Sequence, residues 1–437
     1  MRRELAIVFR ARVTWMAAAL AALLIGHGFI LAIDLFSASS RSALASKLQS
    51  REMDPLAGIV RPTLGGLDLA LVLLGPLLSA RALSMEKERR TFGALCLAAG
   101  SPARVIAAKT AVALLGCGLM VATPIVLLAA YALAGGHIDL LETSVSLGGE
   151  LLRLLLVVMT SMAAAAWTDT LAQAATVGIV ASLTSWAIDA AEGFAALAWL
   201  GGASAWSIER QLAPFGKGLV PVGPFLWLFF AAATGFGLAC VGGSFAQRAR
   251  AKAITAVGVL LGGALLMGSA GTIRHAYDWT EARRASLPPR AVEGLRDLRA
   301  PIEITVYLDR DDSRRRQIES DALQKLVLAR PDIVVRMPLD AEEHPSEAGR
   351  GDDYGRIVVR VGDGIRETRS TSRRELVTLI FEAAGQTLPD WVAPAYPGFP
   401  VVIEGSRRRY LVALAYAGVP TLLLVIGLRL ARRRTAR

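Results

Sequence analysis

The 437-residue sequence is poor in the residues from which most catalytic and redox sites are built: it has three cysteines, four histidines and 19% charged residues. Cys96, Cys117 and Cys240 form no C-x-x-C pair, and none falls in a segment that the topology below places outside the cytoplasm. Neither a disulfide framework nor a dithiol redox site is therefore expected there. His344 has no cysteine or second histidine nearby, which argues against a zinc site. No arrangement of serine, cysteine or paired carboxylates points to an enzyme.

Long apolar runs, by contrast, are abundant. Hydrophobic residues make up 54% of the chain and the mean hydropathy is +0.46, above the roughly 45–50% apolar content of soluble domains. The excess is concentrated in blocks of about 18–25 residues, which are long enough to cross a bilayer as helices. The sequence therefore predicts an α-helical polytopic membrane protein with about eight transmembrane helices. The expected spans are residues 13–35, 64–83, 110–133, 149–167, 171–188, 221–245, 253–273 and 411–430.

Basic residues beside these spans predict the orientation. Lysines and arginines cluster before the first span, between the second and third, between the sixth and seventh, and after the last. With an even number of spans these clusters share one side, which the positive-inside rule assigns to the cytoplasm, together with both termini. Arg41, Lys47, Arg51 and Arg61 in the first outer loop are exceptions. Because the clusters explain the net charge of +11, no nucleic-acid partner is expected; the expected surroundings are a lipid bilayer.

The loop between the second and third spans, residues 84–109, has a distinctive pattern. A charged run at residues 85–90 is followed by Phe92, Leu95 and Cys96 at helical spacing, and Gly100-Ser101-Pro102 then breaks the helix. The pattern predicts a short amphipathic helix presented to the cytosol between two membrane helices. The alternative is a solvated loop whose charges simply follow the topology.

This loop resembles the signature of ABC-2-type transporter permeases. The resemblance rests on Glu86-Lys87-Glu88, Thr91, Leu95, Gly100-Ser101-Pro102 and Lys109, although Arg90 stands where that family usually has glycine. It extends over residues 1–250, as a six-helix permease domain. In that family the segment is the coupling helix, which docks on a separate ATP-binding subunit, and a second permease copy completes the assembly in the bacterial cytoplasmic (inner) membrane. The docking residues that the resemblance implies are Glu86, Glu88, Arg89, Arg90, Thr91, Phe92 and Leu95.

The chain itself is not expected to hydrolyse ATP or to hold a metal. A phosphate-binding loop needs G-x-x-x-x-G-K-[ST], and Gly216-Lys217-Gly218 lacks the leading glycine at that spacing and the hydroxyl. ATP and Mg²⁺ would then bind only to the partner subunit. Asp309, Asp311 and Asp312 form an acidic run, but they lack the ligand spacing and the glycine of a calcium loop, so the pattern favours a solvated turn.

Residues 275–409 differ in kind, because their apolar residues follow the periods of a soluble fold. Ile302, Ile304 and Val306 alternate with polar residues as in a half-buried strand, residues 333–335 and 357–361 predict further strands, and helices are expected near 318–329 and 375–384. The order predicts a small extracytoplasmic α/β domain with a mixed sheet, between a seventh helix at 251–274 and a last helix with a basic cytoplasmic tail at 410–437.

A second resemblance covers this C-terminal part. Asp278, Thr280, Ser286-Leu287 and Pro301, followed by the strand at 304–308, are similar to the start of the extracytoplasmic domain of gliding-motility-type auxiliary ABC components. The later ELVTLIFEAAG also resembles a helix of that family. The two resemblances together imply a permease fused to a shortened auxiliary domain.

Two of the ionisable residues inside the expected spans are singled out as candidates. Asp68 and Arg153 both lie near the outer ends of their spans, and charged groups inside a membrane usually face a bundle interior or a cavity. They are the candidates for an intramembrane polar site, either as a mutual ion pair or on a substrate path. Snorkelling of each side chain to the interface is the alternative.

The functional prediction combines these observations. It is a permease subunit that couples ATP hydrolysis by a separate subunit to movement of a substrate across the cytoplasmic membrane, with export implied by the resemblance. One alternative is an ATP-driven mechanotransmission or gliding-machinery component that transports nothing, which the auxiliary-type domain favours. The other is a membrane-anchored scaffold or binding protein. No convergent polar pocket that would identify the substrate is apparent in the sequence.

Overall fold

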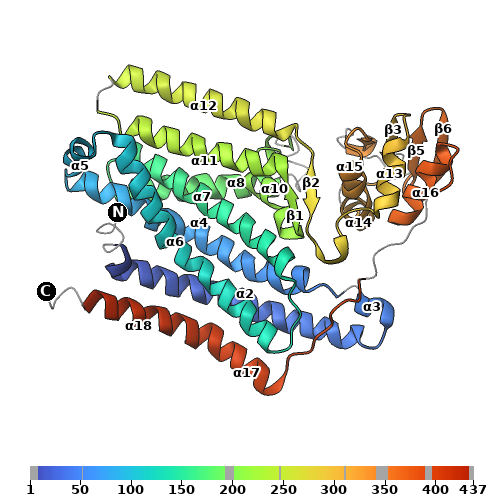
Figure 1. The fold of residues 1–437 in the computed structure, drawn as a ribbon, viewed down its shortest axis with the longest axis horizontal. Helices are drawn as coiled ribbons and strands as arrows, with labels where there is room; N and C mark the ends of the chain where they lie inside the picture. The colour runs from blue at the N-terminus through green and yellow to red at the C-terminus, as the bar shows by residue number, and fades with distance from the viewer. Residues whose placement is uncertain are drawn as a thin grey trace. The chain divides into compact units, whose positions relative to one another are not determined.

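The computed structural model describes residues 8–51, 53–191, 201–245, 248–309, 312–340, 353–388 and 396–432. The chain divides into two compact units, one made of Met1–Ile273 with Pro397–Arg437 and the other of Arg274–Tyr396. The helical first unit is shown together with the second in Figure 1. Each unit has its own hydrophobic core.

Within the described residues, eight helices are long and apolar enough to cross a membrane, in agreement with the predicted number. Two of them are composed of consecutive helical pieces, and most of the bounds run beyond the apolar blocks. They are α2 (Arg12–Ala43), π-helix η1 (Leu56–Val60) continued by α4 (Arg61–Glu88), α6 (Pro102–Leu133), α7 (Leu140–Trp167), α8 (Leu171–Ala191), α11 (Val222–Gly242), α12 (Ala249–Gly271), and α17 (Gly405–Ala413) continued by π-helix η8 (Leu414–Gly418) and α18 (Val419–Arg432).

Helices α4 and α7 form the centre of the bundle. Helix α4 packs against α2, α6, α7 and α8, while α11 covers α7 and α12 covers α11. The last span lies along α2, on the other side of the bundle from α12 (Figure 1). Small residues permit close approach between these helices: a Cβ on Gly66 of α4 would lie 2.8 Å from the Cα of Ile25 in α2.

Short elements occupy the two ends of this bundle. Helix α5 (Phe92–Ala99) lies at one end, between α4 and α6. Helix α10 (Ile208–Leu212), the 3₁₀ turn η3 (Phe215–Lys217) and strand β1 (Leu219–Pro221) lie at the opposite end, before α11 (Figure 1). Helices α3 (Lys47–Arg51) and α9 (Gly201–Ser204) are single turns.

The second unit contains a four-stranded mixed sheet in the order β4-β3-β5-β6. Strand β3 (Ile302–Val306) pairs in parallel with β4 (Val334–Arg336), with Glu303 opposite Val334, and antiparallel with β5 (Ile357–Val361), with Ile304 opposite Val359. Strand β6 (Gly364–Thr368) pairs antiparallel with β5. The side chains of Ile302, Ile304 and Val306 are buried, as their alternation predicts.

Helices surround this sheet. The connection from β3 to β4 runs through α14 (Ser313–Ile318), η5 (Glu319–Leu323) and α15 (Gln324–Ala329), as a parallel crossover requires. Helix α16 (Arg373–Ala383) packs on β5 and β6 and buries Leu376, Ile380 and Phe381. Helix α13 (Pro289–Asp297), strand β2 (Ala276–Asp278) and the short turns η4 (Glu281–Arg283) and η6 (Pro338–Asp340) complete the elements of this unit.

The second unit ends earlier than the sequence analysis expected. Its boundary lies at Tyr396 rather than at residue 409. The segment that follows belongs to the membrane bundle, because the Val401 and Ile403 amides donate hydrogen bonds to the Ser40 and Ser37 hydroxyls of α2, at 3.1 and 3.2 Å. Neither residue extends the apolar block at 411–430, so the pattern of hydropathy gave no sign of this contact.

Candidate functional site

The C-terminal end of α4 carries three consecutive charged residues, Glu86, Lys87 and Glu88, which we call the α4 clamp. Glu86 contacts α6, where the Lys109 ammonium donates a hydrogen bond of 2.8 Å to its Oε1. The Thr91 hydroxyl donates to the other carboxylate oxygen of Glu86. Because the Lys109 side chain is buried, this charge-assisted contact ties α4 firmly to α6.

Lys87 reaches the C-terminus of α7. Its Nζ donates hydrogen bonds to the carbonyl oxygens of Ala165, Ala166 and Thr168, at 3.1, 3.0 and 2.5 Å. The last carbonyls of a helix have no partner within the helix and carry the negative end of its dipole. An ammonium group with three donors therefore satisfies the end of α7 both by hydrogen bonding and by charge.

Glu88 contacts the N-terminus of the next helix, α8. Its Oε1 accepts a hydrogen bond of 2.9 Å from the backbone N–H of Leu171, the first residue of α8. A carboxylate at a helix N-terminus is favoured by the free N–H groups and by the positive end of the dipole. Three neighbouring side chains of α4 thus hold α6, α7 and α8, so a displacement of this end of α4 is passed to three other helices.

Helix α5 begins directly after the clamp. Its Phe92 and Cys96 side chains are buried, and the Phe92 ring lies 5.5 Å from the ring of Phe245, centroid to centroid. Gly100 ends the helix with φ of +75°, and the Ser101 hydroxyl caps α6 by accepting from the Arg104 N–H at 3.3 Å. The predicted short helix therefore exists, with one face anchored to the bundle and the other exposed.

The structure divides the predicted docking residues into two groups. Glu86 and Glu88 make contacts within the chain, Leu95 packs on the bundle core, and Phe92 is only 5% exposed. These four were expected to face a partner, but their side chains take part in the intramolecular anchoring of α4 and α5, although Glu88 is itself exposed. Arg89, Arg90 and Thr91 are exposed.

The most exposed apolar side chain of α5 is one that the sequence analysis did not select. Leu97 is 87% exposed. It follows Phe92 by five positions, which puts it about 140° around the helix from the buried face. The sequence does carry a signal for Leu97, because an apolar side chain stands there at a position where the amphipathic pattern of α5 calls for a polar one. Leu97 and the exposed Arg89, Arg90 and Thr91 therefore form the surface that α5 and its preceding turn present, which we call the α5 surface.

Arg90 adopts a left-handed backbone conformation, with φ of +57°. This conformation costs a residue with a Cβ about 1–2 kcal/mol, whereas glycine adopts it freely. We expect Arg90→Gly to raise the free energy of unfolding by about 0.5–1 kcal/mol after the larger unfolded-state entropy of glycine is subtracted. Thermal unfolding in detergent measures the change.

Arg89→Gly is the matched control for this substitution, because Arg89 has the same charge and a right-handed φ of −80°. Glycine at that position is expected to lower the stability. Equal effects of the two substitutions would show that loss of charge, and not the backbone conformation of Arg90, determines the result.

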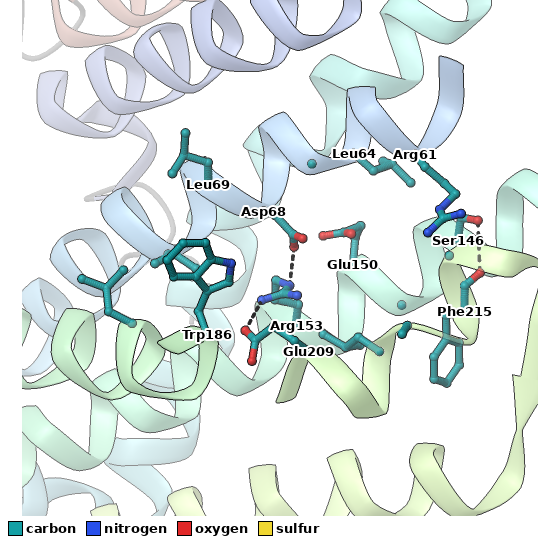
Figure 2. Close-up of a pocket in the computed structure, with 17 residues that line it drawn as sticks. Arg61, Leu64, Asp68, Leu69, Ser146, Glu150, Arg153, Trp186, Glu209 and Phe215 are labelled. Atoms are coloured by element: carbon teal, nitrogen blue, oxygen red, sulfur yellow. Dashed lines mark hydrogen bonds and ion pairs between the residues drawn. The ribbon is translucent and has the colours of Figure 1, made fainter. Parts of the chain in front are cut away.

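A polar pocket lies at the end of the bundle opposite α5, between α4, α7, α8 and α10 (Figure 2). Its volume is about 560 Å³. Asp68 of α4 and Arg153 of α7 form an ion pair through Arg153 Nε. Arg153 Nη1 also donates to Glu209 Oε1 of α10 at 3.2 Å. Asp68 and Arg153 thus form the mutual ion pair that the sequence analysis considered, with Glu209 as a third charged partner.

Hydrogen bonds hold α10 in place beside the pocket. The Ser185 hydroxyl of α8 donates to Glu209 Oε2 at 2.5 Å and accepts from the Ile208 N–H at 2.8 Å. At the far side, the Ser146 hydroxyl of α7 donates to the carbonyl of Phe215 at 3.2 Å. The charged side chains thus come from three elements, α4, α7 and α10, and polar contacts with α8 and η3 fix the surroundings of the cluster.

Two acidic residues of this pocket were not selected from the sequence. Glu150 lies within the expected fourth span, one helical turn before Arg153, so its position on the same helix face was a usable signal. Glu209 belongs to a five-residue helix in a connecting segment. No periodicity extends far enough there to indicate that it faces a transmembrane arginine.

The other sequence candidates have local roles. Gly216 and Lys217 belong to a 3₁₀ turn, which Gly218 ends with φ of +76°, and Gly216 lines the polar pocket. In the second unit, the hydrogen bonds from the Arg314 guanidinium hold the pKa of Asp312 well below its usual range, and the Tyr354 hydroxyl donates to the same carboxylate at 2.9 Å. Asp311 and His344 lie outside the described residues.

The two sites have different chemical capacities. The α4 clamp with the α5 surface provides a rigid connection between an exposed helix and three spans, and the polar pocket provides charged and apolar groups around a cavity. Comparison of the chain with protein families, with curated proteins and with solved structures finds no match.

Proposed function

We propose that this chain is the permease subunit of an ABC-2-type transporter, in which α5 is the coupling helix. The observation that supports this proposal best is the α4 clamp. Force applied to α5 reaches α4 through a short connection, and Glu86, Lys87 and Glu88 then pass it to α6, α7 and α8. A loop that served only to connect two spans would not need three charged contacts to three other helices.

The α5 surface is the docking face in this proposal. Its exposed leucine can fill an apolar hollow in a partner, and its two arginines can set the orientation through charge. The partner is an ATP-binding subunit that holds ATP and Mg²⁺, and a second permease copy completes the assembly. We assign the protein to a bacterial cytoplasmic membrane with both termini in the cytoplasm, and the second unit to the outer side, as an auxiliary-type α/β domain.

The test is affinity purification of the tagged chain from its own cells in mild detergent, with crosslinking. We expect an ATP-binding subunit to copurify with the wild type and its recovery to fall at least tenfold with Leu97→Asp, since a charge would be buried in the apolar contact. Leu133→Asp is the matched control: Leu133 is 86% exposed, nearly the same as Leu97, but it ends α6 at the opposite end of that helix from α5.

Each outcome distinguishes between the functions considered. Loss of the ATPase with Leu97→Asp alone supports docking through the α5 surface. Equal loss with Leu133→Asp points to a general disturbance of the fold, and it contradicts the proposed surface. If no ATP-binding subunit accompanies the wild type, the transporter proposal fails in favour of a scaffold. If the ATPase is bound but reconstituted vesicles transport nothing, mechanotransmission takes its place.

A further inference from the structure

The polar pocket contains more carboxylates than cations. Asp68, Glu150 and Glu209 line it, together with Arg153 and Arg61. Arg61 is exposed, so Arg153 is the cation at the centre of the cluster. Two of its guanidinium nitrogens, Nε and Nη1, already contact carboxylates, namely those of Asp68 and Glu209.

Glu150 is the third carboxylate of the pocket. Its carboxyl group lies beside that of Asp68, and within the described part of the chain no N–H group donates a hydrogen bond to its buried Oε2. Figure 2 shows the Glu150 side chain directed toward Asp68, so that the two acidic groups lie side by side in the pocket. A buried carboxylate oxygen without a donor is costly, which makes it an acceptor for a group that enters the pocket.

The remaining wall of the pocket is apolar. Leu64, Leu69, Val72, Leu183 and Trp186 line it. Leu69 and Leu183 are 49% and 42% exposed, and Trp186 is 62% exposed, so the apolar wall continues onto the outer face of α4 and α8. The volume of about 560 Å³ falls in the range of small-molecule sites, which combine an apolar lining with a few polar groups.

We propose that this pocket binds an organic cation that has N–H donors and an apolar body, such as an alkyl primary ammonium. The donor group would bind Glu150 Oε2, and the apolar body would lie against Leu183 and Trp186. A primary ammonium fits better than a quaternary one because the unpartnered oxygen needs a hydrogen bond as well as a charge. The site is independent of the proposed function, since binding to the isolated chain requires no ATP-binding subunit.

The experiment is equilibrium binding of radiolabelled octylamine to the purified full chain in detergent. Octyltrimethylammonium and octanoate, which share the alkyl chain, serve as competitors. We expect saturable binding of octylammonium, at least tenfold weaker competition by octyltrimethylammonium and none by octanoate. Glu150→Gln should weaken binding at least tenfold. Asp34→Asn, which removes a carboxylate paired with Arg408 in a different part of the bundle, should leave binding unchanged.

A second variant separates binding from folding. Leu183→Trp reduces the pocket volume without a change of charge, and it should also weaken octylammonium binding at least tenfold. Binding that is not saturable, or that is equal in the wild type and both pocket variants, would mean partition into detergent and would overturn the proposal. Stronger binding of octanoate would assign the pocket to anions held by Arg61 and Arg153, with the same consequence.

Discussion

Arg153→Met is expected to lower the free energy of unfolding by about 3 kcal/mol. The substitution keeps a long apolar side chain but removes the guanidinium between Asp68 and Glu209. It leaves three carboxylates in one pocket without their central cation. Breaking a buried ion pair in this way costs about 3–5 kcal/mol. The lower end applies because the Asp68 side chain is 34% exposed and retains part of its hydration.

The matched control for this prediction is Arg408→Met. Arg408 binds Asp34 through two nitrogens at 2.7 and 2.8 Å, but this pair is exposed on both sides. Solvent screens such a pair, so its loss should lower the unfolding temperature much less than Arg153→Met does. Unfolding by heat and by SDS in mixed micelles measures both variants.

Neutralising the carboxylates tests the proposed cause. Asp68→Asn and Glu209→Gln, added to Arg153→Met, remove the charges that the guanidinium balanced. We expect the triple variant to recover at least half of the lost stability, because Glu150 then no longer shares the pocket with two other carboxylates that lack a cation. A triple variant that is no more stable than Arg153→Met would show that packing of the arginine side chain, and not its charge, stabilises the pocket.

The membrane architecture could be predicted from sequence because an apolar run of sufficient length has few alternatives. The backbone of a span must satisfy its own hydrogen bonds, so each such run is a helix. Hydropathy cannot locate the polar ends of these helices. Helix α4 continues through residues 85–88, where the chain is highly charged, because the clamp residues find partners on other helices.

Only the parts of the two sites that depend on neighbouring residues in the sequence could be predicted. The short helix α5 follows from Phe92, Leu95 and Cys96 at helical spacing, and that same spacing marks the buried face. Which residues then remain for a partner depends on contacts with α6, α7 and α8, and those with α7 and α8 lie about 80 positions away in the sequence. Glu209 shows the limit most clearly, since its role depends on Arg153, 56 positions earlier in the chain.

In the second unit, too, one strand could be predicted from the sequence and another could not. Strand β3 was predictable because Ile302, Ile304 and Val306 alternate with polar residues on a half-buried sheet. Strand β6 was not, because Gly364–Thr368 has no buried alternating face and forms by pairing with β5 at the sheet edge. Edge strands of this kind depend on their neighbour more than on their own hydropathy.

Lys87→Met should lower the free energy of unfolding by about 2 kcal/mol, because the three carbonyls at the end of α7 lose a charged donor. The matched control is Lys252→Met. Lys252 Nζ donates to a single carbonyl, that of Gly242 at the end of α11, at 3.3 Å. The control variant should therefore lose much less stability, as measured by thermal unfolding in the same detergent.

Under the proposed function, Lys87→Met also distinguishes docking of the ATP-binding subunit from transmission of its movement to the spans. Lys87→Met leaves Leu97 and the rest of the α5 surface in place, so an ATP-binding subunit should still copurify. Because Lys87 then no longer joins the end of α4 to the C-terminus of α7, movement of α5 would reach this end of α7 less directly, and transport per ATP hydrolysed should fall. Unchanged transport with reduced stability would show that the clamp fixes the resting structure but carries no force to α7.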